Sequence, residues 1–475
     1  MEKKMDAEIL SSYPDVNREK VEKLLQEEVQ KSSRKIVVLD DDPTGVQTVH
    51  DVSVYTDWTE ESIRRGFAEK RNLFYILTNS RGFIKDQTRT AHEEIAAAIA
   101  KVSAEMKKEY MIISRSDSTL RGHYPLETVT LKESIEKMQQ VFFDGEILCP
   151  FFKEGGRFTI NNTHYVKYGD DLIPAAQTEF AKDKTFGYRH SDLCAYIEEK
   201  TDGAYKAEDV VCISLEELRS LDFEKIVDKL CSVTDFGKIV INAVDDTDMK
   251  TAAAAVYRAM EKGKNFMFRT AAAFVKEIGG ITTKPLLTKE QMMVKHTGHG
   301  GVIVVGSHTQ KTTEQLEELK KAEGIVSIEF DSDLVLDDEA FRAETARVTR
   351  EMEKIIASGR TAVAYTKRKL LVIENDTKES ALIRSVKISD AVQSLVGNLK
   401  IEPGFVIAKG GITSSDVGTK ALRVKRATVM GQIRPGIPVW QTGEESRFPF
   451  IPYVIFPGNV GDVDTLREAA EVLMG

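Results

Sequence analysis

A short apolar run that ends abruptly in acidic residues constrains this chain more than any other feature. Residues 36–39 are followed by Asp40, Asp41 and Asp42, and then by Pro43-Thr44-Gly45. An unbroken β-branched run closed by turn residues predicts a buried parallel strand, and open α/β sheets bind ligands beyond the carboxyl ends of such strands. Adjacent carboxylates repel one another unless a cation, a proton or a hydroxylated ligand is shared among them. We therefore expect the acids at the mouth of a pocket, with a solvated acidic turn as the alternative.

Two further predicted strands end in polar clusters. The strand predicted at 72–78 runs into Asn79-Ser80-Arg81-Gly82, and the one at 110–114 runs into the polar segment 115–123. Charged, helix-like segments separate the strands, which predicts a doubly wound sheet with a ligand at its carboxyl edge. Carboxylates accept hydrogen bonds from sugar hydroxyls or remove a proton, whereas arginines bind carboxylate or phosphate. The expected ligand therefore carries hydroxyls and an anionic group. The candidate anion-binding residues are Arg81, Arg115 and Arg121, with a structural ion pair as the alternative for each.

Charge and cysteine content exclude several classes of protein. The chain has 475 residues, enough for two large domains or three smaller ones. Its 66 basic and 75 acidic residues give a formal charge of -9, which disfavours nucleic acid or an anionic membrane as partner. The four cysteines are widely spaced with no C-x-x-C pair, so we expect reduced thiols rather than a zinc ribbon or a disulfide framework. Without an apolar leader or a membrane-length apolar stretch, the expectation is a cytoplasmic protein.

The strand and helix pattern continues to about residue 275 and then restarts. Residues 146–174 begin as a strand and continue as a segment rich in glycine, asparagine and aromatic residues, which predicts a binding loop or lid. His164 in this segment is a candidate ligand contact, with a merely hydrogen-bonded histidine as the alternative. Mixed polarity and glycines at 282–300 place the crossing between domains there. The expected domains are 1–280, with a helical extension at 1–34, and 281–475.

Three glycine-bearing turns mark the second expected domain. An apolar strand ends in Gly306-Ser307-His308-Thr309, and the signature Thr312-x-x-Gln315 predicts a capping box that opens the next helix. Turns at 409–416 and 457–461 repeat the design after two more predicted strands. A strand, a small-residue turn and a helix N-terminus together form an anion cradle of backbone N–H groups. Each turn alone is equally an ordinary βα turn, but three in one domain predict nucleotide or polyphosphate binding.

The ordered motifs of the chain resemble those of the four-carbon acid sugar kinase family. They are D-D-P-T-G at Asp41–Gly45, D-S-T-L-R-G at Asp117–Gly122, C-P-F-F-K-E-G-G-R at Cys149–Arg157, G-S at Gly306-Ser307, G-G-I-T at Gly410–Thr413 and P-G-N-V-G at Pro457–Gly461. The resemblance extends from about Lys35 to the C-terminus. It implies an N-terminal domain that binds a four-carbon sugar acid, such as threonate, erythronate or a 3-oxo-tetronate, and a C-terminal domain that binds ATP.

Site residues in both domains follow from the resemblance by position. The predicted substrate contacts are Asp41, Asp42, Thr44, Gly45, Arg81, Asp117, Ser118 and Arg121, joined by Arg115 from the strand-end pattern. The predicted nucleotide contacts are Ser307, Gly410, Gly411, Ile412, Thr413 and Gly458. No metal ligand is predicted.

The reaction implied by the resemblance is transfer of the γ-phosphoryl group of ATP to a hydroxyl of the sugar acid. We expect an α/β fold of two doubly wound Rossmann-like domains with the ligands in a cleft between them. Phosphoryl transfer needs positioning and charge neutralisation, so the arginines would clamp the substrate carboxylate and Mg²⁺ would accompany the triphosphate. Asp42 or Asp41, with Asp42 favoured, would accept the hydroxyl proton. The alternatives are an ATP-independent sugar-acid lyase or aldolase and a non-catalytic sugar-acid sensor. The expected partners are small molecules and a second copy of the chain in a homodimer, with no nucleic acid and no membrane.

Overall fold

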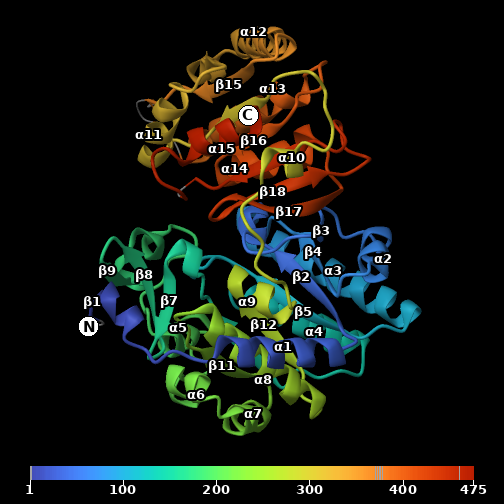
Figure 1. Cartoon of the computed structure of the whole chain (residues 1–475), viewed down its shortest axis with the longest axis vertical. Helices are drawn as coiled ribbons and strands as arrows, with labels where there is room; N and C mark the ends of the chain where they lie inside the picture. Colours follow the sequence, from blue (N-terminus) through green and yellow to red (C-terminus); the bar gives the residue numbers. More distant parts are fainter. Residues whose placement is uncertain (1–2, 370, 372, 374–375, 377, 459) are drawn as a thin grey trace. The chain divides into compact units, whose positions relative to one another are not determined.

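The computed structural model describes residues 3–369, 371, 373, 376, 378–458 and 460–475 (Figure 1). The chain divides into two compact units. Unit 1 comprises Met1–Gly45 and Asp57–Thr283, and unit 2 comprises Val46–Thr56 and Lys284–Gly475. Both units are α/β, as the sequence predicts. The grouping of residues 46–56 with unit 2 was not expected, because so short an excursion leaves no mark in composition or periodicity.

A parallel sheet forms the centre of unit 1, with the strand order β10-β11-β6-β12-β5-β2-β4. The strands are β2 (Lys35–Asp40), β4 (Leu73–Leu77), β5 (Tyr110–Arg115), β6 (Gly145–Cys149), β10 (Val211–Ile213), β11 (Gly237–Ile241) and β12 (Phe266–Thr270). The side chains of β2 are buried on both faces, which explains its unbroken apolar run. The chain passes from β2 to β4 on one side and then to β5 on the other. A topological switch point, where open α/β sheets bind ligands, therefore lies beside β2.

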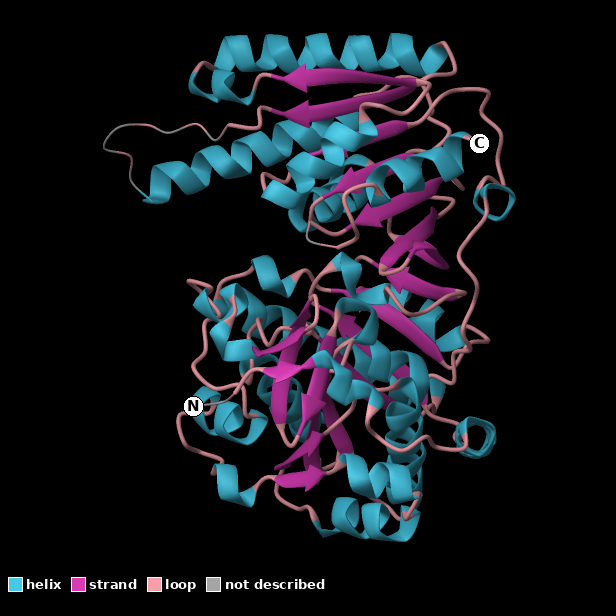
Figure 2. Ribbon diagram, turned by 60° about the vertical axis from the view of Figure 1, so that its left-hand side comes forward, coloured by secondary structure: helices cyan, strands magenta, loops and turns pink. Residues whose placement is uncertain are grey.

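Helices cover both faces of this sheet (Figure 2). They are α1 (Arg18–Lys31), α2 (Glu60–Ala68), α3 (Lys85–Met106), α4 (Leu126–Met138), α5 (Leu193–Lys200), α6 (Leu215–Ser220), α7 (Phe223–Ser232), α8 (Asp246–Glu261) and α9 (Ala272–Ile278). The N-terminal helical extension predicted at 1–34 contains α1, which buries Val21 and Leu25 and packs against α8. Its start is set by Asn17, whose side chain accepts a hydrogen bond from the Lys20 backbone N–H. This helix therefore extends the core of unit 1.

The segment expected to be a loop or lid folds instead as part of an antiparallel sheet in unit 1, so this prediction was wrong. The sheet has the order β1-β9-β8-β7, with β1 (Met5–Asp6), β7 (Arg157–Ile160), β8 (Thr163–Tyr168) and β9 (Asp171–Pro174). Asn161 and Asn162 connect β7 to β8 with φ of 47° and 66°, the left-handed pair that a tight two-residue hairpin requires. Gly169 turns β8 into β9 with φ of 57°. The glycines and asparagines thus form hairpin turns, which composition alone does not separate from a loop.

Unit 2 is built on a mixed sheet of order β3-β17-β18-β19-β16-β13-β15-β14. Its strands are β3 (Val52–Tyr55), β13 (Val302–Val305), β14 (Ile325–Phe330), β15 (Thr361–Thr366), β16 (Val406–Lys409), β17 (Arg426–Arg434), β18 (Ile437–Thr442) and β19 (Pro452–Phe456). The strands from β19 to β14 run parallel, and β17 pairs antiparallel with β3 and β18. The chain visits β14 and β15 on one side of β13 and β16 on the other. A second switch point therefore lies between β13 and β16.

The parallel strands of unit 2 pack against helices through an apolar core. The helices are α10 (Lys289–Met292), α11 (Gln310–Leu319), α12 (Asp338–Ala357), α13 (Lys378–Gly397), α14 (Gly411–Asp416) and α15 (Thr465–Met474). Ile303 of β13, Leu316 of α11 and Leu466 of α15 share one core cluster, and burial of such a side chain contributes about 1.5–3 kcal/mol. The capping prediction for α11 was wrong by one turn. Its N-cap is Thr309, whose side chain accepts a hydrogen bond from the Thr312 backbone N–H.

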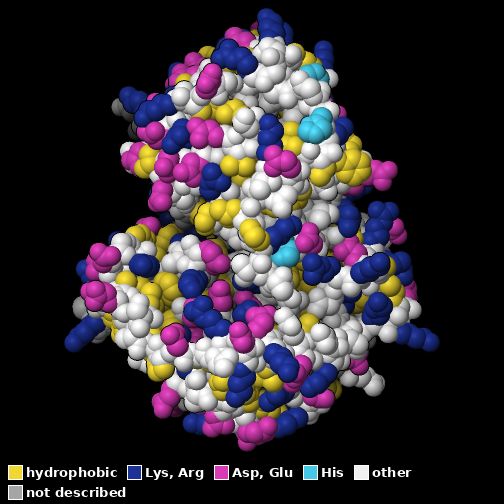
Figure 3. Space-filling model, viewed as in Figure 1, with side chains coloured by type: hydrophobic (Ala, Val, Ile, Leu, Met, Phe, Trp, Pro, Cys, Tyr) yellow, Lys and Arg dark blue, Asp and Glu magenta, His cyan; other side chains and the backbone are white. Residues whose placement is uncertain are grey.

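Charged side chains of both signs are mixed over the surface. On the face shown in Figure 3, basic and acidic groups are interspersed on each unit. An anionic ligand on such a surface must be bound by a local group of residues rather than by a long-range field. Among the residues that the structure describes, none of the helices is long and apolar enough to cross a bilayer.

Candidate functional site

The carboxyl end of β2 carries the three acidic residues, and the first of them is buried in an ion pair. Asp40 pairs with the Arg115 guanidinium, which also donates to the carbonyl oxygens of Asp42 at 2.7 Å and Ser116 at 3.2 Å. Only 4% of Arg115 is exposed. Arg115 was expected to contact substrate, but its charge is balanced within the chain and it holds the acidic loop in place. Gly45 serves the same arrangement, because a Cβ atom there would overlap the Arg115 guanidinium.

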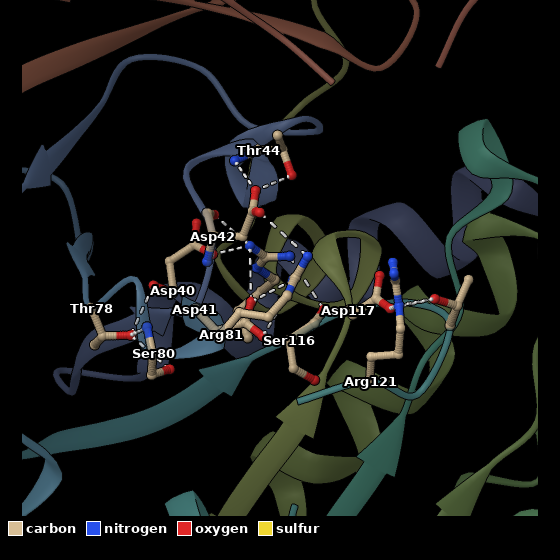
Figure 4. A network of polar contacts seen from close by, with 12 residues as sticks. Asp40, Asp41, Asp42, Thr44, Thr78, Ser80, Arg81, Ser116, Asp117 and Arg121 are labelled. Carbon is tan, nitrogen blue, oxygen red and sulfur yellow. Dashed lines mark hydrogen bonds and ion pairs between the residues drawn. The ribbon is translucent and has the colours of Figure 1, made fainter. Parts of the chain in front are cut away.

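Asp41 and Arg81 form a second pair at this edge (Figure 4). Arg81 Nη2 lies 2.7 Å from Asp41 Oδ1 and Nε lies 3.2 Å from Oδ2, a two-pronged contact between guanidinium and carboxylate. The Asp41 side chain is only 3% exposed. Burial raises the pKa of this carboxyl to about 7, against the opposing effect of Arg81. Asp41 therefore orients Arg81 and offers little accessible surface to a ligand.

Asp42 is the acid that remains open to a ligand, because 16% of its side chain is exposed. Oδ1 accepts hydrogen bonds from the Thr44 backbone N–H at 2.9 Å and from the Thr44 hydroxyl at 2.6 Å. Oδ2 lies 3.3 Å from Arg81 Nη1. Thr44, predicted as a substrate contact, thus holds the orientation of Asp42. Since a carboxylate oxygen has two lone pairs, Oδ2 keeps acceptor capacity for a substrate hydroxyl.

Three buried side chains hold the loop that follows β5. His164 Nε2, the Tyr188 hydroxyl and the Tyr196 hydroxyl donate to the successive carbonyl oxygens of residues 118–120 at 2.7, 2.8 and 2.9 Å. The other ring nitrogen of His164 faces the Thr159 hydroxyl at 3.0 Å. Burial lowers the pKa of His164 to about 4, so the ring is neutral at pH 7. His164 therefore supports the loop, which corresponds to the hydrogen-bonded alternative for this residue.

The same loop carries Asp117 and Arg121 to the site. Arg121 Nε lies 2.7 Å from Asp117 Oδ2, and the Thr119 hydroxyl donates to the same oxygen. Although burial opposes ionisation, Arg121 and Arg81 hold the pKa of Asp117 well below its usual range. Asp117 is therefore an ionised acceptor at neutral pH. The Ser118 side chain is partly exposed on this loop.

Two buried charges below this edge were missed by the sequence analysis. Glu127 of α4 pairs with Arg269 of β12 and accepts a hydrogen bond from the Ser80 hydroxyl at 2.5 Å. Arg269 also donates to the Ser114 hydroxyl at 2.9 Å. A Cβ atom on Gly122, whose φ is +120°, would lie 2.7 Å from the Arg269 guanidinium. Arg269 lies next to the last residue of β12, so the strand-end pattern applied to β2, β4 and β5 would have found it if extended to this strand. Glu127 lies within a helical pattern, which carries no such signal.

In unit 2, the turns that follow β13, β16 and β19 meet at one edge of the sheet. The Thr312 hydroxyl, in the first turn of α11, lies 3.2 Å from the Gly458 carbonyl oxygen, to which it can donate, and 3.0 Å from the Ser307 hydroxyl. Thr413 approaches Gly306 so closely that a Cβ atom there would overlap the Thr413 hydroxyl. Three turns that are far apart in the sequence therefore line one small polar region.

The turn after β16 adds backbone and small side chains to this region. Gly410 has φ of +121°, and a Cβ atom on it would lie 3.2 Å from Cβ of Ser307. Ile412 is 74% exposed. The structure thus brings together the predicted nucleotide contacts Ser307, Gly410, Gly411, Ile412, Thr413 and Gly458. Asn459 of the third turn lies outside the described residues.

A buried lysine beneath these turns was not predicted as a site residue. Lys409 is fully buried at the end of β16, and its Nζ donates to the Pro457 carbonyl oxygen at 2.6 Å and lies 4.2 Å from the centre of the Phe456 ring. Within the described part of the chain, no carboxylate pairs with it. Burial lowers the pKa of Lys409 to about 7, and Lys311 contributes to the lowering. A buried ammonium without a counter-ion is costly, and an anion bound beside it reduces that cost.

Arg368 approaches the same region from the segment after β15. Its Nη2 donates to the Ser307 carbonyl oxygen at 2.7 Å and to the Thr313 hydroxyl at 2.9 Å. Its Nη1 is buried and has no hydrogen-bond partner among the described residues. Two cations, Arg368 and Lys409, therefore lie beside turns that suit a polyphosphate. Among the side chains that the structure describes, no group of three or more His, Cys, Asp or Glu is placed to hold a metal ion.

Comparisons with known families and structures relate both units to described domains. Residues 36–278 match the family model of a sugar-binding N-terminal domain, and residues 302–466 match that of a nucleotide-binding C-terminal domain. The structure is similar to that of Haemophilus influenzae protein HI1011, of family DUF1537, with 16% identity over 92% of this chain and 100% of that chain and a TM-score of 0.59. A Salmonella typhimurium LT2 protein provisionally described as a tRNA synthase gives 15% identity, coverage of 92% and 98%, and a TM-score of 0.62. At this identity the likeness shows the fold. A comparison with functionally curated proteins gives no significant match.

Proposed function

The chain belongs to the four-carbon acid sugar kinase family, and we propose that it transfers the γ-phosphoryl group of ATP to a hydroxyl of a sugar acid of the threonate, erythronate or 3-oxo-tetronate type. The observation that carries this proposal is that each unit has its own ligand-binding edge with a different chemistry. Unit 1 presents the Asp42 carboxylate, which is held by Arg81 and Thr44, and unit 2 presents glycine turns beside a buried lysine. A lyase or aldolase would need only the first edge.

In unit 1, Asp42 is the proposed general base. It is more exposed than Asp41, and its Oδ2 has acceptor capacity that Asp41 has already used on Arg81. As the acceptor oxygen bonds to the γ-phosphorus, the bond from that phosphorus to the β,γ-bridging oxygen breaks, ADP leaves, and the proton of the hydroxyl passes to Asp42. General-base assistance of this kind contributes about 10²- to 10⁴-fold to a rate. Thr44 and Arg81 hold the two oxygens of Asp42, so this carboxylate is oriented before the substrate binds.

In unit 2, the edge formed by Ser307, Thr312, Gly410 and Gly458 is the proposed site for the phosphates of ATP. Hydroxyl groups and backbone N–H groups donate to phosphate oxygens, and Lys409 supplies the positive charge. ATP enters as its magnesium complex, in which Mg²⁺ is held mainly by phosphate oxygens and water. The protein therefore needs few metal ligands of its own.

The test measures ADP release in a coupled assay. The assay contains Mg-ATP and, one at a time, the members of a panel of D- and L-threonate, D- and L-erythronate and the 3-oxo-tetronates. The proposal predicts strong stimulation by one member of the panel. Turnover of a sugar acid without ATP would favour the lyase or aldolase. If the protein binds a sugar acid but no member of the panel stimulates ADP formation, a sensor is favoured. A shift of the melting temperature by ATP alone checks the nucleotide edge independently of catalysis.

A further inference from the structure

Two of the three arginines expected to clamp the substrate carboxylate already have partners inside unit 1. Arg115 pairs with Asp40, and Arg81 pairs with Asp41 and Asp42. These two guanidinium groups face three carboxylates, so this part of the site has no positive charge to spare. A substrate carboxylate placed against it would meet like charge, which is unfavourable. The carboxylate of a sugar acid must therefore be bound elsewhere at this edge.

Two guanidinium groups that share the contact of one carboxylate lie beside the loop that follows β5, on Arg121 and Arg157. Both guanidinium groups lie against the ring of Phe180, with Cζ atoms 5.1 and 5.5 Å from its centre. Arg121 uses Nε to bind Asp117, and its two terminal nitrogens have no hydrogen-bond partner among the described residues. Figure 4 shows Arg121 to one side of the cluster formed by Asp42 and its neighbours.

Arg157 is the less satisfied of the two. Its Nε is buried with no hydrogen-bond partner, and no carboxylate of the described residues pairs with its guanidinium. Burial lowers the pKa of Arg157, although the charge of Asp117 opposes this. Nearby acids are engaged elsewhere, since Asp117 binds Arg121 and the exposed Glu179 accepts a hydrogen bond from the Tyr168 hydroxyl at 2.8 Å.

We propose that Arg121 and Arg157, resting on Phe180, form the subsite for the carboxylate of the acceptor. Asp117 is the one described carboxylate that contacts this pair, whereas Asp183 and Glu179 act on it without contact, so the Arg157 guanidinium is left for the carboxylate of a monoanionic acid. The planar fork of an arginine matches a carboxylate in a two-pronged contact. The inference rests on the proposed function for the claim that the acceptor is a hydroxylated acid. It adds which residues select the acid over a neutral sugar, and it places the acid group at Arg157 and a hydroxyl at Asp42.

The antiparallel sheet of unit 1 gains a role from this inference. Arg157 is the first residue of β7, so the hairpin that was expected to be a loop carries this arginine to the site. Gly155 leaves room for it, because a Cβ atom there would lie 2.9 Å from Arg157 Nη1. The motif that ends at Arg157 thus delivers a guanidinium group beside the loop of Arg121.

The experiment compares Arg157→Met and Arg157→Lys with the wild type, using the best sugar acid of the panel and the matching sugar alcohol. R157M is expected to raise KM for the acid about 10- to 100-fold, in line with loss of a charge-assisted contact. KM for ATP should stay within about twofold of the wild-type value. The preference for the acid over the alcohol should fall by the same factor by which KM for the acid rises. R157K keeps the charge without the planar fork, so its KM for the acid should lie between the values of wild type and R157M. Arg189→Met, at an exposed arginine 3.4 Å from Glu199, is the matched control and should behave as wild type.

Direct calorimetric binding of the acid without ATP separates this inference from the proposed function. If wild type binds the acid in calorimetry but forms no ADP when Mg-ATP is added, the kinase proposal fails. The subsite is then still judged by whether R157M loses binding of the acid. If wild type is an active kinase and R157M keeps its KM for the acid, the subsite is refuted and the kinase stands. Equal losses for acid and alcohol would also refute it, because they would indicate a structural role. Wild type that binds none of the acids would overturn both.

Discussion

The two candidate ligand-binding edges of this protein differ in how their charges are balanced. At the edge of unit 1, Asp40, Asp41 and Asp42 face Arg81 and Arg115, so most charges are balanced inside the chain. The edge of unit 2 consists of glycine turns and hydroxyl groups above a fully buried lysine that no described carboxylate balances.

The difference indicates what each edge leaves for its ligand. A balanced network can hold one partly exposed carboxylate in a defined orientation, which suits binding and deprotonation of a hydroxyl. A buried ammonium without a counter-ion is instead stabilised when an anion such as phosphate arrives. On the proposed function, the edge of unit 1 would therefore bind the acceptor and the edge of unit 2 would bind the phosphates of ATP.

The largest expected effect comes from removing the base at the balanced edge. Asp42→Asn keeps the shape of the side chain but cannot accept the hydroxyl proton, so kcat should fall about 10²- to 10⁴-fold. The affinity for ATP, measured by calorimetry, should stay unchanged. Asp86→Asn, at an exposed acid in the first turn of α3, is the control and should keep wild-type kcat. Loss of ATP binding in D42N would break the separation of the two edges.

The next effect comes from removing the unbalanced charge in unit 2. Lys409→Met should weaken ATP binding about 10- to 100-fold and leave sugar-acid binding unchanged. The pKa of Lys409 is about 7, and a bound phosphate raises it, so binding above pH 7 must take up a proton. Wild-type affinity should therefore fall from pH 7 to pH 9 relative to K409M. Lys354→Met, at an exposed lysine of α12, is the control, and an identical pH profile for K409M and wild type would refute the role of Lys409.

The same substitution has a consequence for stability. The unfolded chain binds a proton at Lys409 up to its ordinary pKa of 10.5, whereas the folded chain releases it above about 7. The unfolded state thus holds more protons between pH 7 and 10.5, and the stability of the wild type without ligand rises with pH across this window. K409M should melt at a higher temperature than wild type at pH 7, and the difference should narrow toward pH 10. A difference in melting temperature that stays constant from pH 7 to pH 10 would show that burial does not lower the pKa of Lys409.

A smaller effect is expected from crowding the balanced network. Gly45→Ala places a methyl group against the Arg115 guanidinium and should lower stability by about 1–3 kcal/mol. Because Arg115 holds the acidic loop, KM for the sugar acid should rise while ATP binding is retained. Gly82→Ala is the matched control, since a Cβ atom there contacts nothing within 4 Å. Equal melting temperatures for the two variants would contradict the packing of Arg115 against Gly45.

The smallest effect is expected at the exposed rim of the phosphate edge. Ile412 is 74% exposed, so Ile412→Ser should change the free energy of unfolding by less than about 0.5 kcal/mol. If Ile412 contacts the nucleotide, the affinity for ATP falls a few-fold and the affinity for phosphate alone does not. Unchanged affinity for both would remove Ile412 from the site.

Much of the fold could be predicted from periodicity. The apolar runs that became β2, β4 and β5 and the amphipathic pattern of α1 were placed correctly. The region of β7 to β9 was not, because hairpins with Asn161-Asn162 and Gly169 turns have the composition of a loop. The N-cap of α11 was misplaced by three residues, because Thr312 has the glutamine of a capping box three positions on, whereas the helix begins at Gln310 with Thr309 as its N-cap.

The candidate site could be predicted only in part, because the sequence shows which charges exist but not which are balanced. Strand-end patterns located Asp42, Arg81 and the turns of unit 2. Whether an arginine faces a ligand or an aspartate depends on partners distant in the sequence, as Asp40 is from Arg115. The same limit applies to Lys409, whose importance comes from burial without a carboxylate.

Amide hydrogen exchange of the wild type with one ligand at a time tests the central claim most directly, because it locates each ligand without any substitution. The account predicts that Mg-ATP alone slows exchange at residues 306–313 and 409–416. It predicts that the sugar acid alone slows exchange at 41–46 and 116–122. Protection of 41–46 by ATP, with 306–313 and 409–416 unchanged, would contradict the division between an acceptor edge in unit 1 and a nucleotide edge in unit 2.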